Sequence, residues 1–252
     1  MTLMQESFAR VETKYLLTVS QAAVMEMGLM RLGFKKTDFG SPSVHSLYYD
    51  TDDFTLIRSS LERPGYKEKL RLRAYGEPGN LAQSFVEIKK KYNGVVYKRR
   101  TEMPLKEAMN ALSQGRMPEK TGQVGREVEW MTRRYGLHPA AIISYDRDAW
   151  FCREQPGVRI TFDRSLTFRD WKTDLNVRTT GISLLPADRR LMEIKTNGTY
   201  PLWLVRLLQE TGIQRTHFSK YGLAYLQYIR PRTDGTERSD FNCSTVSLSL
   251  GA

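Results

Sequence analysis

The chain has 252 residues, of which 40% are apolar and 27% charged, so its composition is that of a folded domain and excludes a disordered or fibrous protein. Its 39 lysines and arginines exceed its 28 acidic residues, and the formal net charge of +11 favours anionic partners such as nucleic acid, anionic lipid or phosphorylated compounds. Two cysteines make no disulfide framework, and no stretch approaches the roughly 20 apolar residues that cross a bilayer. We therefore expect a soluble, cytoplasmic protein.

Eight segments alternate apolar and polar residues with a period of two, which predicts strands. They cover residues 10–17, 43–50, 67–75, 83–90, 94–103, 140–151, 157–169 and 189–196. Apolar positions with helical spacing predict helices over 21–33, with Ser20 as the cap, and over 105–115, 125–136, 202–212 and 217–228.

We expect a single α+β domain over residues 1–230, most simply an antiparallel β-barrel of about eight strands that forms a tunnel, with helices packed on the outside. Residues 231–252 are polar and are predicted to be a disordered tail. The four tryptophans have no base-stacking motif around them and are interpreted as packing residues.

The segment "KEKLRLRAY" places Lys67, Lys69, Arg71 and Arg73 on one face of a strand, with no acid among them. One interpretation is that each strand turns its charges to water. However, like charges about 4 Å apart at an effective dielectric of about 20 repel by about 4 kcal/mol, unless an anion lies between them. The alternative is an inward basic lining, because helices could cover the apolar faces. Arginine and lysine in such a lining suit phosphate groups.

Carboxylates share these charged faces in several strands. Glu-x-Lys recurs at residues 12–14, 87–89 and 193–195. A carboxylate together with phosphate oxygens is a common way to hold Mg²⁺ or Mn²⁺. Phosphoryl chemistry is therefore a hypothesis from the residues alone.

The motifs resemble, in order, those of VTC-type polyphosphate polymerase domains within the CYTH or triphosphate tunnel metalloenzyme superfamily. They are "ETKYLL", "SLYYDT", "KLRLRAYG", "VEIKKKYNGVVYKRR", "SYDRDAW", "VRITFD", "LMEIK" and "SKY", and they extend over roughly residues 7 to 228. The resemblance implies an antiparallel tunnel that binds the phosphates of ATP and transfers the terminal phosphoryl group to a growing polyphosphate chain.

The same resemblance implies roles for individual residues. The catalytic group comprises Arg71, Arg73, Lys89, Arg147, Arg159 and Lys220. The phosphate-binding group comprises Lys14, Lys98, Tyr145, Lys195 and Ser219, and Glu193 is the metal ligand for Mn²⁺ or Mg²⁺. Arg99 is left as an alternative to Lys98. The family often has a lysine at the position of His217, which puts the contribution of that position in doubt.

A departure on the first strand bears on the reaction. Hydrolytic members of the superfamily carry Glu-x-Glu-x-Lys there, whereas this chain has Arg10, Glu12 and Lys14. Loss of one carboxylate favours transfer to a phosphate acceptor, although Glu87 could still act as a base toward water. The alternatives are a metal-dependent triphosphatase and a non-catalytic module that binds polyanions. The expected partners are ATP and polyphosphate, not nucleic acid, and a membrane partner is left open.

Overall fold

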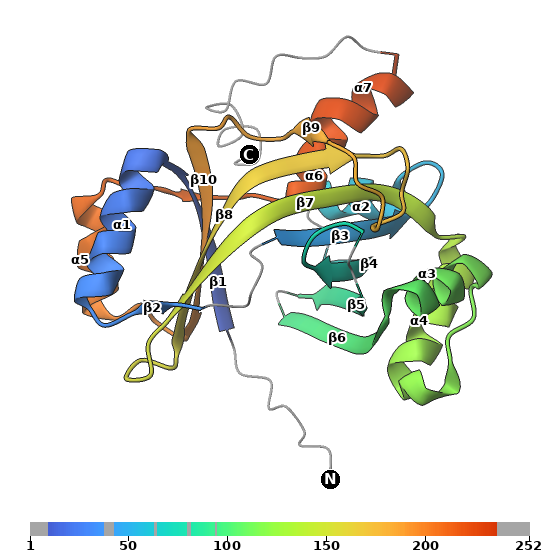
Figure 1. Cartoon of the computed structure of the whole chain (residues 1–252), viewed down its shortest axis with the longest axis horizontal. Helices are drawn as coiled ribbons and strands as arrows, with labels where there is room; N and C mark the ends of the chain where they lie inside the picture. The colour runs from blue at the N-terminus through green and yellow to red at the C-terminus, as the bar shows by residue number, and fades with distance from the viewer. Residues whose placement is uncertain (1–9, 38–42, 63–64, 80–81, 94, 236–252) are drawn as a thin grey trace.

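The computed structural model describes residues 10–37, 43–62, 65–79, 82–93 and 95–235 (Figure 1). All eight predicted strands are present: β1 (Arg10–Thr18), β3 (Ser43–Asp50), β4 (Tyr66–Tyr75), β5 (Gln83–Tyr92), β6 (Val95–Pro104), β7 (His138–Phe151), β8 (Val158–Arg169) and β10 (Arg189–Asn197). Three two-residue strands were not predicted: β2 (Lys35–Lys36), β9 (Ile182–Ser183) and β11 (Arg215–Thr216).

The strands form a single antiparallel sheet in the order β11-β1-β10-β8-β7-β3-β4-β5-β6, with β2 beside β7 and β9 beside β8. Within the described residues no ladder joins β6 to β1 or β11, so hydrogen bonding does not close the sheet into the predicted barrel. The long strands β7 and β8 bend between the two halves of the sheet (Figure 1). The architecture is α+β, as expected, and the sheet is strongly curved.

Helices cover the outer face of the sheet at both ends. α1 (Val19–Arg31) and α5 (Leu202–Glu210) lie beside β1, β8 and β10, where Leu17, Ile160 and Ile194 contribute to their apolar interface. α3 (Leu105–Gln114) and α4 (Gly122–Tyr135), joined by a short 3₁₀ turn (Glu119–Thr121), cover β4 to β6 around Leu72 and Val86. Successive side chains of a strand point to opposite faces of the sheet. Because these apolar side chains point outward to the helices, the charged side chains of the same strands point to the inner face.

A third helical group covers part of that opposite face. It consists of α2 (Thr55–Leu61), α6 (Lys220–Ala224), a π-helical turn (Tyr225–Ile229) and α7 (Arg230–Thr233). Tyr48 on β3 stacks on Tyr221 of α6, with ring centroids 4.7 Å apart. This packing holds the start of α6 against the charged face.

The structure changes some boundaries. Thr18, not Ser20, caps α1, because its side chain accepts from the Gln21 amide while the Gln21 side chain accepts from the Thr18 amide. α7 continues beyond the domain boundary predicted at residue 230, and residues 236–252 of the predicted tail lie outside the described residues. In the described ranges, no helix combines the length and the apolar character required to span a membrane.

Candidate functional site

The charged face of the sheet is concave, because side chains from strands far apart in the ladder meet across it. The Glu12 carboxylate on β1 lies 3.9 Å from Nζ of Lys89 on β5, although β10, β8, β7, β3 and β4 lie between these strands in the sheet order. The segment before α6 also lies within the curve. Lys14 Nζ donates to the Phe218 carbonyl at 2.9 Å, and Lys69 Nζ lies 3.5 Å from Ser219 Oγ.

Asp163 on β8 is fully buried and binds two of the predicted catalytic cations. Arg147 donates from Nε and Nη2 to its two oxygens at 2.6 and 2.7 Å, and Lys220 Nζ lies 2.5 Å from Oδ2. The Tyr145 ring lies beneath both cations, with Arg147 Cζ at 5.1 Å and Lys220 Nζ at 4.3 Å from its centroid. Although burial acts to raise it, Lys220 and Arg147 hold the pKa of Asp163 below its usual value.

The pairing of Arg147 with Asp163 depends on an irregularity between β7 and β8. Their register shifts between Ser144 and Asp146, and Ser165 on β8 adopts a left-handed backbone with φ of 52°. Such a bulge changes which residues stand opposite each other. Arg147 and Asp163 are directly paired in the resulting register.

Glu87 on β5 is the second buried acceptor, with 2% of its surface exposed. Arg71 Nε lies 2.7 Å from Oε2, Lys98 Nζ lies 2.7 Å from Oε1, and Arg73 Nε is 3.8 Å away. Although burial acts to raise it, these three cations lower the pKa of Glu87 to about 2. Arg71 also donates to the Tyr48 hydroxyl at 3.3 Å. The two predicted arginines of β4 are thus fixed in position before any ligand arrives.

Glu193 on β10 forms the third cluster. Its Oε1 lies 2.7 Å from Lys195 Nζ, and its Oε2 lies 3.9 Å from Lys14 Nζ. Glu12 contacts the same two lysines at 3.9 and 3.5 Å. Although burial acts to raise it, Lys195 and Lys14 hold the pKa of Glu193 well below its usual range. The hydroxyl of Thr161, directly opposite Glu193 in the ladder, is buried without a hydrogen-bond partner among the described residues.

We call fourteen charged residues of this concave face the lining set; Lys67 and Arg100 alternate onto the same face but are not counted in it. As defined from the described residues, it contains ten cations: Lys14, Lys69, Arg71, Arg73, Lys89, Lys98, Arg147, Arg159, Lys195 and Lys220. It contains four carboxylates: Glu12, Glu87, Asp163 and Glu193. The set therefore carries an excess of six positive charges when all members are ionised, which favours a polyanionic ligand.

The structure separates Lys98 from its alternative Arg99. Lys98 stands opposite Lys89 in the ladder and faces the lining, whereas Arg99 stands opposite Ile88 on the outer face and pairs with Glu127 of α4. Alternation along β6 thus sends the two neighbouring cations to opposite sides of the sheet.

Arg159 makes fewer contacts than the other predicted catalytic cations. It stands opposite Lys195 and so shares the lining face, but it is exposed and makes no hydrogen bond or ion pair within the described part of the chain. Ser219 is the N-cap of α6 and accepts from the Gly222 amide at 3.2 Å, which orients its hydroxyl. His217 is exposed in the segment before α6.

Sequence reasoning missed several members of the lining. The facing of Asp163, Glu87 and Glu12 was readable from strand alternation, but which cations each carboxylate holds was not. Lys69 belonged to the visible row of four cations and was assigned no function. Tyr48 gave no signal, because "LYYD" does not show which tyrosine faces inward.

The predicted metal ligand of the lining set is Glu193. Within the described ranges, no three His, Cys, Asp or Glu side chains lie close enough together to hold an ion. Glu193 is held ionised by Lys195 and Lys14 and lies opposite the unpartnered Thr161 hydroxyl. These residues fit a hard cation such as Mg²⁺ or Mn²⁺ whose remaining ligands come from phosphate oxygens and water.

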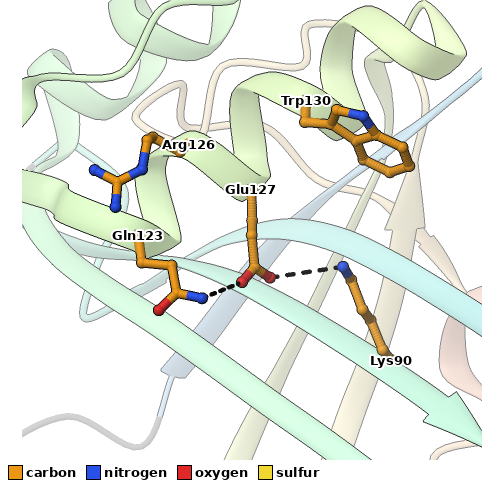
Figure 2. Close-up of a pocket in the computed structure, with 5 residues that line it drawn as sticks. All are labelled: Lys90, Gln123, Arg126, Glu127 and Trp130. Carbon is orange, nitrogen blue, oxygen red and sulfur yellow. Dashed lines mark hydrogen bonds and ion pairs between the residues drawn. The ribbon is translucent and has the colours of Figure 1, made fainter.

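A separate hollow of about 440 Å³ lies on the outer face of the sheet (Figure 2). It is lined by Lys90, Gln123, Arg126, Glu127 and Trp130, which belong to β5 and α4. Lys90 points away from the lining, because it alternates with Lys89. Trp130 is 54% exposed, so the expected packing function does not hold for this tryptophan.

The VTC domain model matches residues 9–229, and no curated protein matches. A "putative adenylate cyclase" from Bacillus halodurans has 17% identity over 83% of this chain and 93% of its own, with a TM-score of 0.51.

Another "putative adenylate cyclase", from Vibrio parahaemolyticus, has 16% identity over 87% of this chain and 98% of its own, with a TM-score of 0.48. The PH1819 protein of Pyrococcus horikoshii OT3 has 16% identity over 85% of this chain and 97% of its own, with a TM-score of 0.43. At such identities the Bacillus structure supports the fold alone. The family model covers most of the sequence, and the chain therefore belongs to the VTC domain family.

Proposed function

We propose that this protein is an ATP-dependent polyphosphate polymerase, which transfers the terminal phosphoryl group of ATP to the end of a polyphosphate chain and releases ADP. The observation that carries the proposal is the lining set, in which ten cations from seven strands and α6 face four carboxylates on one concave surface. A row of linked phosphates has the charge and the length to contact several of these clusters at once.

Transfer needs alignment and charge neutralisation more than it needs a base. The terminal oxygen of polyphosphate is already an anionic nucleophile, so the protein must bring it into line with the γ-phosphorus and stabilise the charge of the transition state. Arg71 and Arg147 are held by Glu87 and Asp163, so their guanidiniums are oriented before the phosphates bind. Lys220 adds a further charge beside Arg147.

Hydrolysis by the same lining is less well supported, because water requires a carboxylate that can accept its proton. Glu87 is the candidate left open by the sequence, but Arg71, Arg73 and Lys98 surround it and its pKa is lowered to about 2. Asp163 is buried between two cations. Both carboxylates are therefore weak bases, which favours the polymerase over the triphosphatase.

The family implies a divalent metal, and Glu193 would hold Mn²⁺ or Mg²⁺ together with phosphate oxygens. When bound, the ion supplies positive charge to the phosphate groups. Lys195 and Lys14 keep Glu193 ionised and orient its carboxylate. The cations of the lining set bind and align the phosphate groups.

The test is incubation of purified protein with ATP, Mn²⁺ and a short polyphosphate primer, with products separated by gel electrophoresis and ³¹P NMR. Long chains and stoichiometric ADP are expected. Orthophosphate as the sole phosphate product, undiminished by added primer, would identify a triphosphatase instead. Tight binding of polyphosphate with no consumption of nucleotide would identify a binding module.

A further inference from the structure

Lys69 is the one β4 cation of the lining set that has no carboxylate within ion-pair distance among the described residues. Arg71 and Arg73, which follow it on the same face of β4, both contact Glu87. Lys69 instead approaches the Ser219 hydroxyl, 3.5 Å from its Nζ. An ammonium without a counter-ion inside a half-buried site is destabilised by the loss of water.

The charged groups that face Lys69 are also cations. They come from three strands: Lys14 on β1, Lys67 on β4 and Lys89 on β5, while Tyr48 on β3 acts in the opposite direction and raises the pKa of Lys69. Burial and these three ammoniums lower the pKa of Lys69 to about 8. A fraction of the protein therefore holds Lys69 as a neutral amine at slightly alkaline pH.

We propose that Lys69 is a further phosphate-binding residue, and that it takes up a proton from solvent when a phosphate group binds beside Ser219. The inference rests on the proposed function only for the class of ligand. A phosphate oxygen supplies the counter-ion that the empty site lacks, so the ammonium becomes the stable form of Lys69 in the complex. The proton adds one positive charge where the ligand adds negative charge.

Phosphate binding should also favour the protonated form of Tyr48. Although burial acts to raise it, Arg71, Lys69 and Arg73 lower the pKa of the Tyr48 phenol to about 8. A bound phosphate group destabilises the negatively charged phenolate of Tyr48 and so favours the neutral hydroxyl. Binding therefore raises the pKa of both groups, and affinity for phosphate falls as the pH rises through 8 toward the pKa values of the complex.

The experiment is isothermal titration calorimetry of the full chain with tripolyphosphate at pH 8, without metal, in two buffers of different ionisation enthalpy. The dependence of the observed enthalpy on the buffer gives the number of protons taken up. Lys69→Arg keeps the charge but stays protonated, so we expect it to take up about half a proton less than the wild type at pH 8, given a pKa of about 8. Protons exchanged by the ligand itself cancel in this difference.

Matched variants separate the contributors. Lys106→Arg, on the exposed face of α3, should match the wild type, and the Lys69→Arg difference should persist in a Tyr48→Phe background. Lys69→Met should weaken tripolyphosphate binding by about ten- to a hundred-fold at pH 7, as expected for loss of a charged hydrogen bond. In the ligand-free wild type, NMR of ¹³C-methylated lysines should show Lys69 titrating near pH 8.

Equal proton uptake by wild type and Lys69→Arg, or titration of Lys69 near the usual lysine value in the ligand-free protein, would overturn the inference. Proton uptake through Lys69 in a protein that makes no polymer would leave the inference intact and refute the polymerase. Absence of tripolyphosphate binding would refute both.

Discussion

Replacing Asp163 with asparagine removes one negative charge from a site where two cations depend on it. Asp163 is fully buried, and it binds Arg147 through both oxygens and Lys220 through one. The substitution preserves the side-chain shape, so its cost arises from leaving the two cations without their acceptor. Removing one partner of a buried ion pair costs about 3–5 kcal/mol. For a chain of this size each kcal/mol lowers Tm by about 2–4 °C, so we expect Asp163→Asn to unfold about 10 °C below the wild type.

Thermal unfolding followed by circular dichroism at pH 7, with and without tripolyphosphate, measures this effect. Asp188→Asn serves as the control, because Asp188 is exposed and its contact with Arg189 is 3.8 Å long, so its loss should change Tm by no more than about 1 °C. Tripolyphosphate supplies a new acceptor to Arg147 and Lys220, so it should raise the Tm of Asp163→Asn more than that of the wild type. A variant that unfolds within 1 °C of the wild type, or equal stabilisation of both proteins by the ligand, would refute this account of Asp163.

Three further outcomes follow from the lining. Folding lowers the pKa of Glu87 from about 4.3 to about 2, so the ionised carboxylate stabilises the folded protein by about 3 kcal/mol above pH 4.3, and this stabilisation disappears as the pH falls toward 2. In urea unfolding at a series of pH values, Glu87→Gln should lose this part of the pH dependence of the free energy of unfolding. A pH dependence equal to that of the wild type would contradict the assignment. Glu193→Ala should abolish metal-dependent turnover of ATP and keep the circular dichroism spectrum of the exposed control variant Glu210→Ala. Full activity of Glu193→Ala would show that Glu193 is not the metal ligand. Lys98→Met should weaken tripolyphosphate binding by about ten-fold in calorimetry, whereas Arg99→Met, which changes the neighbouring outward side chain, should not. Equal losses of affinity in the two variants would contradict the inward direction of Lys98.

Strand alternation made much of the lining predictable. The charged positions of "KEKLRLRAY" and "LMEIK" share one face in the sequence, and the structure places them on one face of the sheet. Which face lies inside could not be read from any single strand, because it depends on the helices that cover the apolar positions of β4 and β10. The contact between Glu12 and Lys89 depends on the curvature of the whole sheet, which leaves no local pattern.

Other features had physical causes that a sequence pattern does not show. The register that sets Asp163 opposite Arg147 follows from an irregularity at Ser165, a residue type with no strong preference for a left-handed backbone. α2 was missed because it lacks an ordinary N-cap. Its Leu56 and Ile57 amides donate to the Asp50 carboxylate, at the end of the preceding strand.

The four carboxylates of the lining set also determine how strongly added salt weakens polyphosphate binding. A linear polyanion holds condensed counterions, and a protein releases them in proportion to the charge that it neutralises. Because Glu12, Glu87, Asp163 and Glu193 already offset four of the ten cations, the charge available to the ligand is about six. The magnitude of the slope of log affinity against log salt concentration should therefore be smaller than the number of lysines and arginines that contact the polyphosphate. Affinity then falls less steeply with added salt, and binding is preserved at the ionic strength of a cell.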